Sequence, residues 1–495
     1  MDEKNKNKEF VKEITPRSVD YSQWYVDVIL KAELMDYSPV KGCMVIRPYG
    51  YSIWENIQRL LDKRIKDTGH ENAYFPMFIP RELLQKEADH VEGFAPEVAW
   101  VTKGGNEILA EPLVVRPTSE AIICNMYSRW VQSWRDLPVL INQWCNVVRW
   151  EKSTKPFLRT SEFLWQEGHT CHRTEEEAEE EAQKMLQVYR EFIETELAVP
   201  VHAGRKTDRE KFAGAKFTYT VEAMMSDGKA LQAGTSHNLG QHFAKVFDIT
   251  FMDQDDELKH VWQTSWGVST RLIGAVIMAH GDDRGLVLPP AISPVQTVIV
   301  PIITKKQRDE VLAKVDDLTA SLKEIVRVKA DKRDEYSPGW KFNEWEMKGV
   351  PLRLELGPRD LQDNKVIAVR RDTGTKEEIK FEDIEKKVPL LLQEIQENLF
   401  RKALEFRSNN TVVIDDYQLF CKQIEEKAGF IRSGWCGKED CEEKVKEDTK
   451  ATIRCIIPEA ESKDEDTAVH EEEAGKKCIA CEEKAMHKVY FARSY

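Results

Sequence analysis

The chain has 495 residues, of which 72 are Lys or Arg and 86 are Asp or Glu, so its formal net charge is −14. This length predicts two or three domains. The acidic balance argues against a protein that coats nucleic acid without preference, because neutralising phosphates requires a basic face. No run reaches the roughly 18 apolar residues of a membrane span, and residues 1–6 lack a signal peptide's apolar stretch, so a cytoplasmic protein without membrane contact is expected.

Residues 1–16 are expected to be a charged tail, and residues 17–290 to be the largest domain. Within this domain a helical pattern at 53–66 is followed by short β-rich runs, which lie at 113–115, 139–141 and 247–251. Long helical patterns alternating with short strands predict an α+β fold, a mainly antiparallel sheet with helices packed against it.

One helix of this domain is predicted from its own residues. Thr174 and Glu177 have the spacing of a capping box at a helix start. Beyond them apolar residues recur at steps of three and four, as on one face of an amphipathic helix; they are Ala178, Ala182, Met185, Tyr189 and Phe192.

A hairpin is predicted around residues 147–165. Val147 and Val148 end one strand, the polar residues 152–155 and Pro156 form a loop, and residues 163–165 begin the return strand. The hairpin carries Arg149, Arg159 and Phe163. A guanidinium matches phosphate or carboxylate oxygens two at a time, and a Phe ring can stack on a purine, so the hairpin is suited to ATP. Taken alone, Arg149 and Glu151 are more typical of a solvated surface pair.

Two further domains are expected after Pro289-Pro290. Residues 295–300 read as an apolar strand, 306–323 as a helix, and 352–356 and 366–369 as strands, which predicts an α/β domain with a partly parallel sheet at 291–405. A second break near Asn409-Asn410 precedes a small cysteine-bearing domain, taken as 406–495. Its acidic segment, residues 456–477, is expected to be a mobile loop.

The cysteines fall into two groups. In a cytoplasmic chain they should be reduced, and four isolated ones are interpreted as packing residues: Cys43, Cys124, Cys145 and Cys171. Cys436-x4-Cys441 and Cys478-x2-Cys481 offer four thiolates, as a structural zinc site requires. The alternative is four unpaired thiols, and the spare ligand candidates are Cys421, Cys455 and His487.

Three stretches together resemble the signature motifs of the class II aminoacyl-tRNA synthetases. Residues 73–78 resemble motif 1, residues 149–169 motif 2, and residues 266–271, which open an apolar helix, motif 3. The sequence of these motifs is similar to that of prolyl-tRNA synthetases of the archaeal and eukaryotic type. The resemblance extends from about residue 15 to Tyr495. It is carried by residues 116–120, 157–160, 163–169 and 232–241.

The resemblance implies an enzyme that activates L-proline with ATP to prolyl-adenylate and transfers proline to tRNA(Pro). Arg149 would bridge the amino-acid carboxylate and the α-phosphate, and Arg271 would hold the γ-phosphate. Gln232 is a candidate Mg²⁺ ligand. The expected ATP-binding residues are Arg149, Glu151, Arg159, Thr160, Phe163, Gln232, Thr235, Ser269 and Arg271.

The proline site follows from the chemistry of proline, a secondary ammonium in an apolar ring. Thr118 and Glu120 suit the ammonium, and Phe163 and Trp165 suit the ring. His237, among small residues, is interpreted as a pocket residue; for His169 a structural role is an equal alternative. Arg149 completes the expected proline-binding residues.

By the same resemblance, residues 17–290 form the class II catalytic domain, 291–405 the anticodon-binding domain and 406–495 a zinc-binding α+β domain. The anticodon readers are expected among Lys341, Glu355, Arg359 and Asp360, since Arg suits guanine acceptors and carboxylates suit donors. Motif 1 implies a homodimer, and the family's terminal tyrosine, here Tyr495, reaches toward the active site. Only residues 170–266 separate His169 from Gly267, so no editing insertion is expected there.

Two other functions fit part of the pattern. One is a synthetase-like binding protein that has lost its chemistry, against which stand the four residues Arg149, Glu151, Arg159 and Arg271. The other is a class II synthetase for threonine or serine. The threonine enzyme uses a zinc in its catalytic domain, whereas the paired cysteines here lie beyond Ser433.

Overall fold

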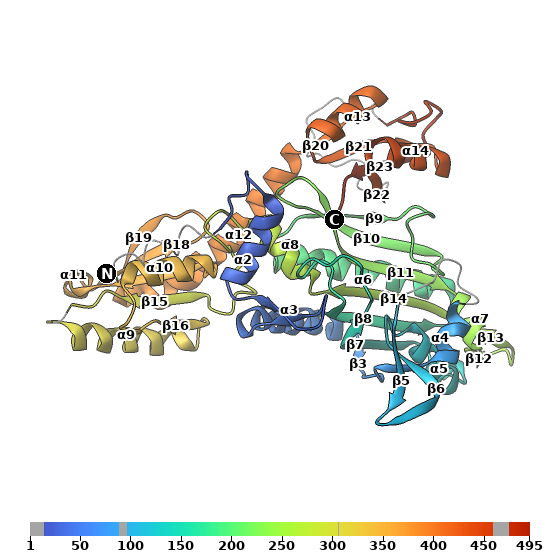
Figure 1. The fold of residues 1–495 in the computed structure, drawn as a ribbon, viewed down its shortest axis with the longest axis horizontal. Coiled ribbons are helices and arrows are strands. Elements are labelled where there is room, and N and C mark those ends of the chain that lie inside the picture. Colours follow the sequence, from blue (N-terminus) through green and yellow to red (C-terminus); the bar gives the residue numbers. More distant parts are fainter. Residues whose placement is uncertain (1–13, 89–96, 305, 459–474) are drawn as a thin grey trace.

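The protein is described here from a computed structural model, which covers residues 14–88, 97–304, 306–458 and 475–495. Its centre is an eleven-stranded sheet in the order β20-β21-β23-β22-β9-β10-β11-β14-β8-β7-β3 (Figure 1). From β9 to β7 every neighbouring pair is antiparallel, and β3 is parallel to β7. The predicted, mainly antiparallel sheet is confirmed. Its strands in this part are β3 (Glu71–Asn72), β7 (Val139–Val148), β8 (Glu162–His172), β9 (Val201–Arg205), β10 (Phe217–Met224), β11 (Ala230–Gly240) and β14 (Trp262–Ser269).

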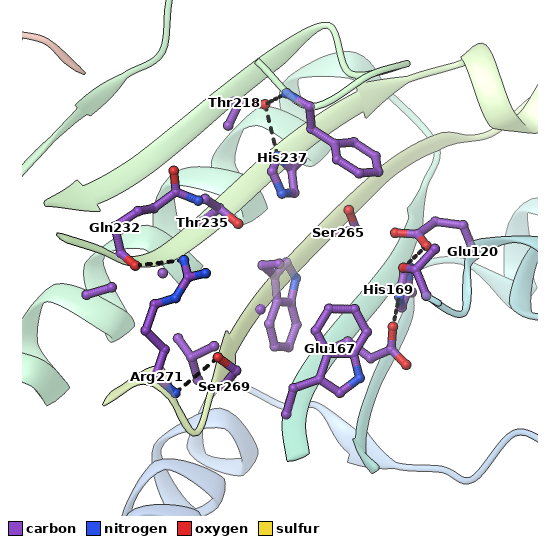
Figure 2. A pocket seen from close by; sticks show the side chains of 18 of the residues that line it. Glu120, Glu167, His169, Thr218, Gln232, Thr235, His237, Ser265, Ser269 and Arg271 are labelled. Carbon is purple, nitrogen blue, oxygen red and sulfur yellow. Dashed lines mark hydrogen bonds and ion pairs between the residues drawn. The ribbon is translucent and has the colours of Figure 1, made fainter. Parts of the chain in front are cut away.

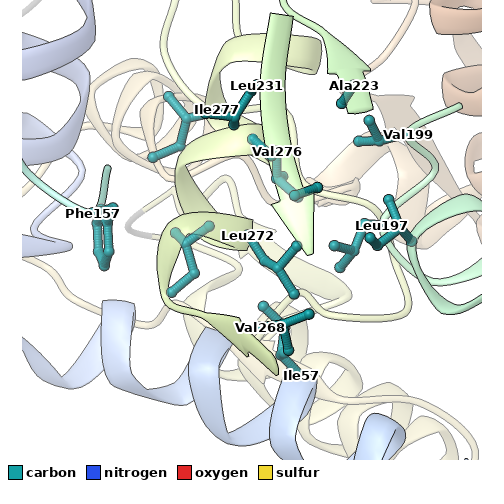
Figure 3. Packing of buried hydrophobic residues seen from close by; sticks show 14 of the residues in the cluster. Ile57, Phe157, Leu197, Val199, Ala223, Leu231, Val268, Leu272, Val276 and Ile277 are labelled. Carbon is teal, nitrogen blue, oxygen red and sulfur yellow. The ribbon is translucent and has the colours of Figure 1, made fainter. Parts of the chain in front are cut away.

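The main hydrophobic core lies between this sheet and four helices. Its buried side chains come from α2 (Tyr21–Lys31), α3 (Pro48–Asp67), α6 (Glu175–Thr195) and α8 (Arg271–His280). Figure 3 shows Leu272, Val276 and Ile277 of α8 among side chains of other elements, with Ile57 of α3 near Val268 of β14. The hairpin of β1 (Met35–Tyr37) and β2 (Met44–Ile46) lies between α2 and α3 in the chain.

Helix α6 agrees with its prediction in every core residue, since the five apolar positions named above are all fully buried. Its start differs from a capping box. Thr174 Oγ1 does accept from the Glu177 amide at 3.2 Å, but the Glu177 carboxylate accepts from the amide of Arg173, not of Thr174, at 2.9 Å. The glutamate therefore satisfies a donor one residue earlier than expected.

A second core cluster forms around α5 (Glu120–Trp130) and α7 (His242–Phe247). The predicted strand at 247–251 is partly wrong, because Phe247 ends α7 and Asp248 takes a left-handed conformation with φ of 54° before β12 (Thr250–Met252). β12 pairs with β13 (Leu258–His260). A separate three-stranded sheet beside them consists of β4 (Phe78–Pro80), β5 (Ala99–Gly104) and β6 (Glu107–Val115), next to α4 (Arg81–Ala88).

The following α/β unit has a five-stranded sheet in the order β16-β15-β17-β18-β19. Strands β16, β15 and β17 are parallel, and β17, β18 and β19 are antiparallel, so the partly parallel sheet is confirmed. Its elements are β15 (Thr297–Pro301), α9 (Arg308–Lys323), β16 (Val328–Ala330), α10 (Pro338–Met347), β17 (Leu352–Leu356), α11 (Pro358–Gln362), β18 (Lys365–Arg370), β19 (Lys376–Lys380) and α12 (Ile384–Asn409).

The last segment has its own hydrophobic core, yet its strands extend the central sheet. Ile456 of β22 pairs with Arg205 of β9, which joins the two sets of strands. The expected boundary at residues 405/406 falls inside α12, which ends at Asn409. The elements are β20 (Thr411–Val413), α13 (Tyr417–Glu426), β21 (Phe430–Trp435), α14 (Glu439–Thr449), β22 (Thr452–Ile456) and β23 (His487–Ala492).

Two sequence predictions fall largely outside the described residues: most of the charged tail, and residues 459–474 of the expected acidic loop. Within the described part of the chain, no helix combines the length and apolar character that crossing a membrane would require.

Phe192 tests the role of α6 in the main core. Its ring is fully buried, so Phe192→Ala should lower the free energy of unfolding by about 3–5 kcal/mol through lost burial and the cavity left behind. Urea unfolding measures this. Gln187→Ala, on the exposed face of the same helix, should change it by less than about 0.5 kcal/mol; equal losses in both variants would contradict the assigned core.

Candidate active site

A cavity of about 290 Å³ opens on the face of β8, β14 and β11. Successive side chains of a strand point to opposite faces, and alternate residues of β8 therefore enter this cavity together: Phe163, Trp165, Glu167 and His169. β14 contributes Ser265 and Trp266, and β11 contributes Gln232, Thr235 and His237 (Figure 2). The cavity thus gathers residues of the predicted motifs 2 and 3 and of the segments 116–120 and 232–241, whereas residues 73–78 of the predicted motif 1 do not line it.

The two principal arginines are held by backbone carbonyls, not by carboxylates. Arg149 Nε donates to Pro117 O at 3.0 Å, and the guanidinium lies over the rings of Phe163 and Trp165, 5.4 and 5.5 Å from their centroids. Arg271 Nε donates to Leu158 O at 3.2 Å and Nη1 to Gln232 O at 3.4 Å. Both guanidinium charges therefore remain available to a ligand.

The arginines also repel one another. Burial lowers the pKa of Arg271, and the charges of Arg159 and Arg149 lower this pKa further. A bound polyanion would relieve this repulsion, which makes this end of the cavity suitable for phosphate groups. Ser269 Oγ accepts from the Arg271 amide at 3.2 Å and so fixes the start of α8 beside them.

Three predicted ATP residues lie outside the cavity lining. Glu151 and Arg159 form a loose ion pair, with 3.8 Å between Oε2 and Nη1, and the Arg159 side chain is exposed. The hydroxyl of the buried Thr160 donates to Glu162 O at 2.7 Å. Among the predicted set, the structure gathers Arg149, Phe163, Gln232, Thr235, Ser269 and Arg271 around the cavity.

The opposite end of the cavity is acidic. The Thr118 hydroxyl donates to the buried Glu120 carboxylate. Glu167, which the sequence analysis did not single out, accepts from Ser119 and Gln143 and lies 3.1 Å from His169 Nε2. Burial alone would raise the pKa of Glu167, but its bonds to His169, Ser119 and Gln143 outweigh burial and lower it. The alternation along β8 was the signal that could have identified it.

The pKa values of the two cavity histidines are shifted in opposite directions. Burial lowers the pKa of His169, yet the bond to Glu167 and the charges of Glu120 and Glu167 outweigh it, so the net pKa is raised. For His237, burial and the neighbouring His169 lower the pKa to about 3. His237 is therefore neutral near pH 7; its Nδ1 lies 2.9 Å from Thr218 Oγ1, and its ring lies 4.8 Å from that of Phe212.

The face of β8 opposite the cavity depends on Gly168. A Cβ at this position would lie 2.1 Å from the Trp266 indole, so only glycine allows Trp266 to pack there, in the core with Tyr189 of α6. Trp266 and Ser265 were not predicted as lining residues. Glu210, Lys211, Phe212 and Thr218 also line the cavity without having been predicted, because the segment that contains them carries no motif.

The four predicted zinc cysteines come together. Their sulfurs lie within 4.8 Å of one another, with Cys436 Sγ 3.6 Å from Cys441 Sγ and 3.7 Å from Cys481 Sγ. A tetrahedral ion with Zn–S bonds of about 2.3 Å requires sulfurs about 3.8 Å apart, so the group fits zinc. Cys421, Cys455 and His487 lie on α13, β22 and β23, outside this group.

The four predicted anticodon residues are unequally accessible. Lys341 is buried and donates to Asp331 O at 3.1 Å, and the buried Glu355 pairs with Arg353 and Lys376. Asp360 caps α11 by accepting from the Gly357 amide at 2.8 Å. Arg359, in contrast, is exposed.

Comparisons with known proteins match the chain from end to end. The family model "tRNA synthetase class II core domain (G, H, P, S and T)" matches residues 105–280, "Anticodon binding domain" residues 296–390, and "Prolyl-tRNA synthetase, C-terminal" residues 417–495. Proline--tRNA ligase of Natranaerobius thermophilus is 63% identical over 491 residues, 99% of both chains. The chain belongs to the prolyl-tRNA synthetase family.

Two further relatives support the assignment to the prolyl-tRNA synthetase family. Proline--tRNA ligase of Alkaliphilus oremlandii is 59% identical over 490 residues, again 99% of both chains. The crystal structure of prolyl-tRNA synthetase from Cryptosporidium parvum, complexed with halofuginone and AMPPNP, has a TM-score of 0.90 at 42% identity and covers 98% of this chain and 99% of its own. The chain is thus an enzyme of the proline–tRNA ligase class, with a class II core, an anticodon-binding domain and the family's C-terminal domain.

The raised pKa of His169 predicts a pH-dependent stability. A cation whose pKa rises on folding stabilises the fold below its ordinary value of 6.5, and this contribution is lost as the pH rises through the folded pKa. The difference in unfolding free energy between wild type and His169→Asn should therefore fall between pH 6 and pH 9.

His280→Asn is the matched control. Burial lowers the pKa of His280 to about 4, so its stabilising contribution grows from about pH 4 to 6.5 and does not fall above that. A His169 difference that is flat from pH 6 to pH 9 would contradict the assigned charge.

Proposed function

We propose that the chain activates L-proline with ATP to form prolyl-adenylate and then transfers proline to the 3′ end of tRNA(Pro). The observation that supports this best is the polarity of one cavity, with carboxylates at one end, Arg271 at the other, and Arg149 over the aromatic rings between them. A secondary ammonium with an apolar ring fits the first end, and a triphosphate fits the second.

Activation requires alignment of two anions, the amino-acid carboxylate and the α-phosphate, more than it requires a nucleophile. Arg149 lies between the aromatic wall and the phosphate end and is assigned as the bridging donor. Arg271, on the first residue of α8, is assigned to the γ-phosphate. Both are the proposed catalytic residues.

The other ATP contacts are assigned along the same wall. Phe163 would stack on adenine, with Glu151 at its edge. Arg159 and Thr160 would reach the phosphates once the hairpin loop closes on the ligand. Gln232, Thr235 and Ser269 line the phosphate end. Mg²⁺ would neutralise phosphate charge, held largely by the phosphates themselves, with the Gln232 amide oxygen as the protein ligand.

The proline ring is assigned to the wall of Phe163 and Trp165. The ammonium is assigned to Glu120 and Thr118, which already share a hydrogen bond at the acidic end. His169 and His237 close this end from β8 and β11. His169, whose pKa the neighbouring carboxylates raise, is the histidine that more readily takes up a proton beside them, while the neutral His237 adds a polar contact without adding charge.

ATP–pyrophosphate exchange with purified protein against all twenty amino acids tests the proposal. Exchange dominated by proline supports it, and no exchange with any amino acid would leave a synthetase-like binding protein. Weak exchange with alanine or cysteine is also expected, because a pocket rejects smaller side chains by only about 1–3 kcal/mol per methylene.

We further propose that the chain has no editing domain and is of the archaeal and eukaryotic type. The segment between β8 and β14, residues 173–261, is described throughout and consists of the helices α6 and α7, the central-sheet strands β9 to β11 and the separate pair β12–β13. The likeness to the Cryptosporidium parvum enzyme supports the type, although the two relatives named above are bacterial. Deacylation of alanyl-tRNA(Pro) by this chain would contradict the absence of editing.

Several assembly features belong to the same proposal. The charged tail would precede a catalytic domain of residues 17–290, an anticodon-binding domain from 291 to the end of α12, and a zinc-binding domain beyond it. A homodimer in the cytoplasm is proposed, with exposed apolar side chains around β4–β6 at its interface: Tyr74, Phe78, Trp100 and Ile108.

Arg359 is the proposed anticodon reader that needs no rearrangement. Lys341, Glu355 and Asp360 would first have to exchange their present partners.

Arg149→Ala tests the bridging role. Removal of one preorganised donor in such a site costs about a hundred- to a thousandfold in rate. Proline-dependent pyrophosphate exchange should fall by this factor. Arg173→Ala, which removes a guanidinium that pairs with Glu177 outside the cavity, is the control and should retain activity; an unchanged rate in Arg149→Ala would refute the assignment.

Tyr495 tests the contribution of the C-terminal residues. Its hydroxyl donates to Asp227 at 2.5 Å, and its ring lies 5.0 Å from both Lys229 Nζ and Lys155 Nζ, the latter in the loop between Arg149 and Arg159. A tag after Tyr495 should therefore lower exchange activity more than a tag before Met1. Equal activity of the two tagged proteins would count against this role.

A further inference from the structure

The segment 206–216, between β9 and β10, forms one wall of the substrate cavity. Glu210, Lys211 and Phe212 line the cavity beside His237. Phe212 is fixed at both ends, because its amide donates to Thr218 Oγ1 at 2.9 Å and its ring packs against His237. Residues 206–216 contain no strand or α-helix, so other contacts must hold this wall in place.

The Lys206–Glu222 ion pair and the packing of Phe212 and Ala215 in the core around α7 hold part of the segment. Further contacts come from α14 of the C-terminal domain. Thr207 Oγ1 donates to Glu442 Oε1 at 2.9 Å, and both residues are buried. Arg209 pairs with Glu443 at 2.9 Å, and Lys446 Nζ lies 3.6 Å from Glu210 Oε1. One face of a single helix thus contacts three residues of the segment, the last of which lines the cavity.

Helix α14 is itself firmly placed. Its third residue, Cys441, belongs to the four-cysteine group, and Val445 is buried in the hydrophobic core of the C-terminal domain. On the far side Lys444 donates to Ala480 O at 3.2 Å. The helix therefore links the cysteine group to the segment 206–216 through continuous contacts.

The buried pair matters most among these contacts. Exposed ion pairs such as Arg209–Glu443 contribute little, whereas Thr207 and Glu442 have lost water and depend on each other. Glu442 Oε2 is buried and has no hydrogen-bond partner among the described residues, so its carboxylate cannot rotate away without losing its one protein donor.

We propose that α14 positions the substrate-cavity wall, with Glu442 and Thr207 as positioning residues for amino-acid binding. The wall they support faces His237 at the amino-acid end, while Arg271 and Ser269 lie across the cavity (Figure 2). Loss of the contact therefore raises the KM for proline and leaves the KM for ATP unchanged. This inference rests on the proposed function for its substrate.

Glu442→Leu in the full-length protein tests the contact, because it keeps the bulk and removes the acceptor. The KM for proline in pyrophosphate exchange should rise about three- to tenfold, with the KM for ATP and kcat within about twofold of wild type. Glu442→Gln keeps a carbonyl acceptor for Thr207 and should restore the wild-type KM. Glu447→Leu, at an exposed position of the same helix, is the matched control and should behave as wild type.

Hydrogen exchange separates this inference from the proposed function, since it needs no substrate. Amides 207–216 should exchange faster in Glu442→Leu than in wild type, and the strands β8 and β14 should not change. An unchanged proline KM, unchanged exchange of 207–216, or a parallel rise in both KM values would overturn the positioning role. If Glu442→Leu does not fold, Thr207→Val removes the donor of the same hydrogen bond, and the same KM and hydrogen-exchange measurements on that variant test the positioning role. A wild type without proline-dependent activity would overturn the proposed function alone.

Discussion

Antiparallel pairing of β8 with β14, and of β14 with β11, is the constraint on which the site depends. Trp266 stands opposite Gly168 in the first pair and opposite Ser236 in the second. A shift of one residue would turn the side chains of β8 to the other face, removing the aromatic wall and the carboxylate together. The fit of Trp266 onto Gly168 opposes such a shift, because a neighbouring residue with a Cβ would collide with the indole. The packing of Trp266 on the core face of the sheet thereby fixes which side chains of β8 face the cavity.

Charge is distributed along the cavity in the order that the reaction requires. Arg149 and Arg271 are anchored through carbonyl oxygens, which orient a guanidinium without neutralising it. The carboxylates at the other end are compensated instead, by hydroxyl and amide donors and by His169. A site with its cations satisfied by protein carboxylates would have little affinity left for phosphates.

Local patterns in the sequence predicted the features that are built from local structure. The steps of three and four in α6, the strand–loop–strand pattern before Phe163 and the spacing of the four cysteines each led to the right element or group. The assignment of roles to Arg149 or Glu120 came from resemblance to a family, not from periodicity. Glu167 could have been found by alternation along β8.

Other features depend on partners distant in the chain. Segment 206–216 lines the cavity and packs against α14, which follows more than two hundred residues later. Charged residues are rarely buried. Lys341 and Glu355, which were expected to read anticodon bases, are nevertheless buried, and they pair with Asp331 and Arg353. Asp248, in a left-handed conformation, interrupts residues 247–251, which were predicted as a strand.

The extension of the central sheet by β22 also bears on how the protein is made. Ile456 pairs with Arg205, and the amide of Ala230, at the start of β11, donates to Arg493 O at 2.8 Å. A ribosome adds about 5–20 residues per second, so β9 and the start of β11 wait tens of seconds, with unpaired backbone groups, for partners that have yet to be synthesised. An enzyme that supplies translation with an amino acid thus completes its own sheet only when its translation is nearly finished.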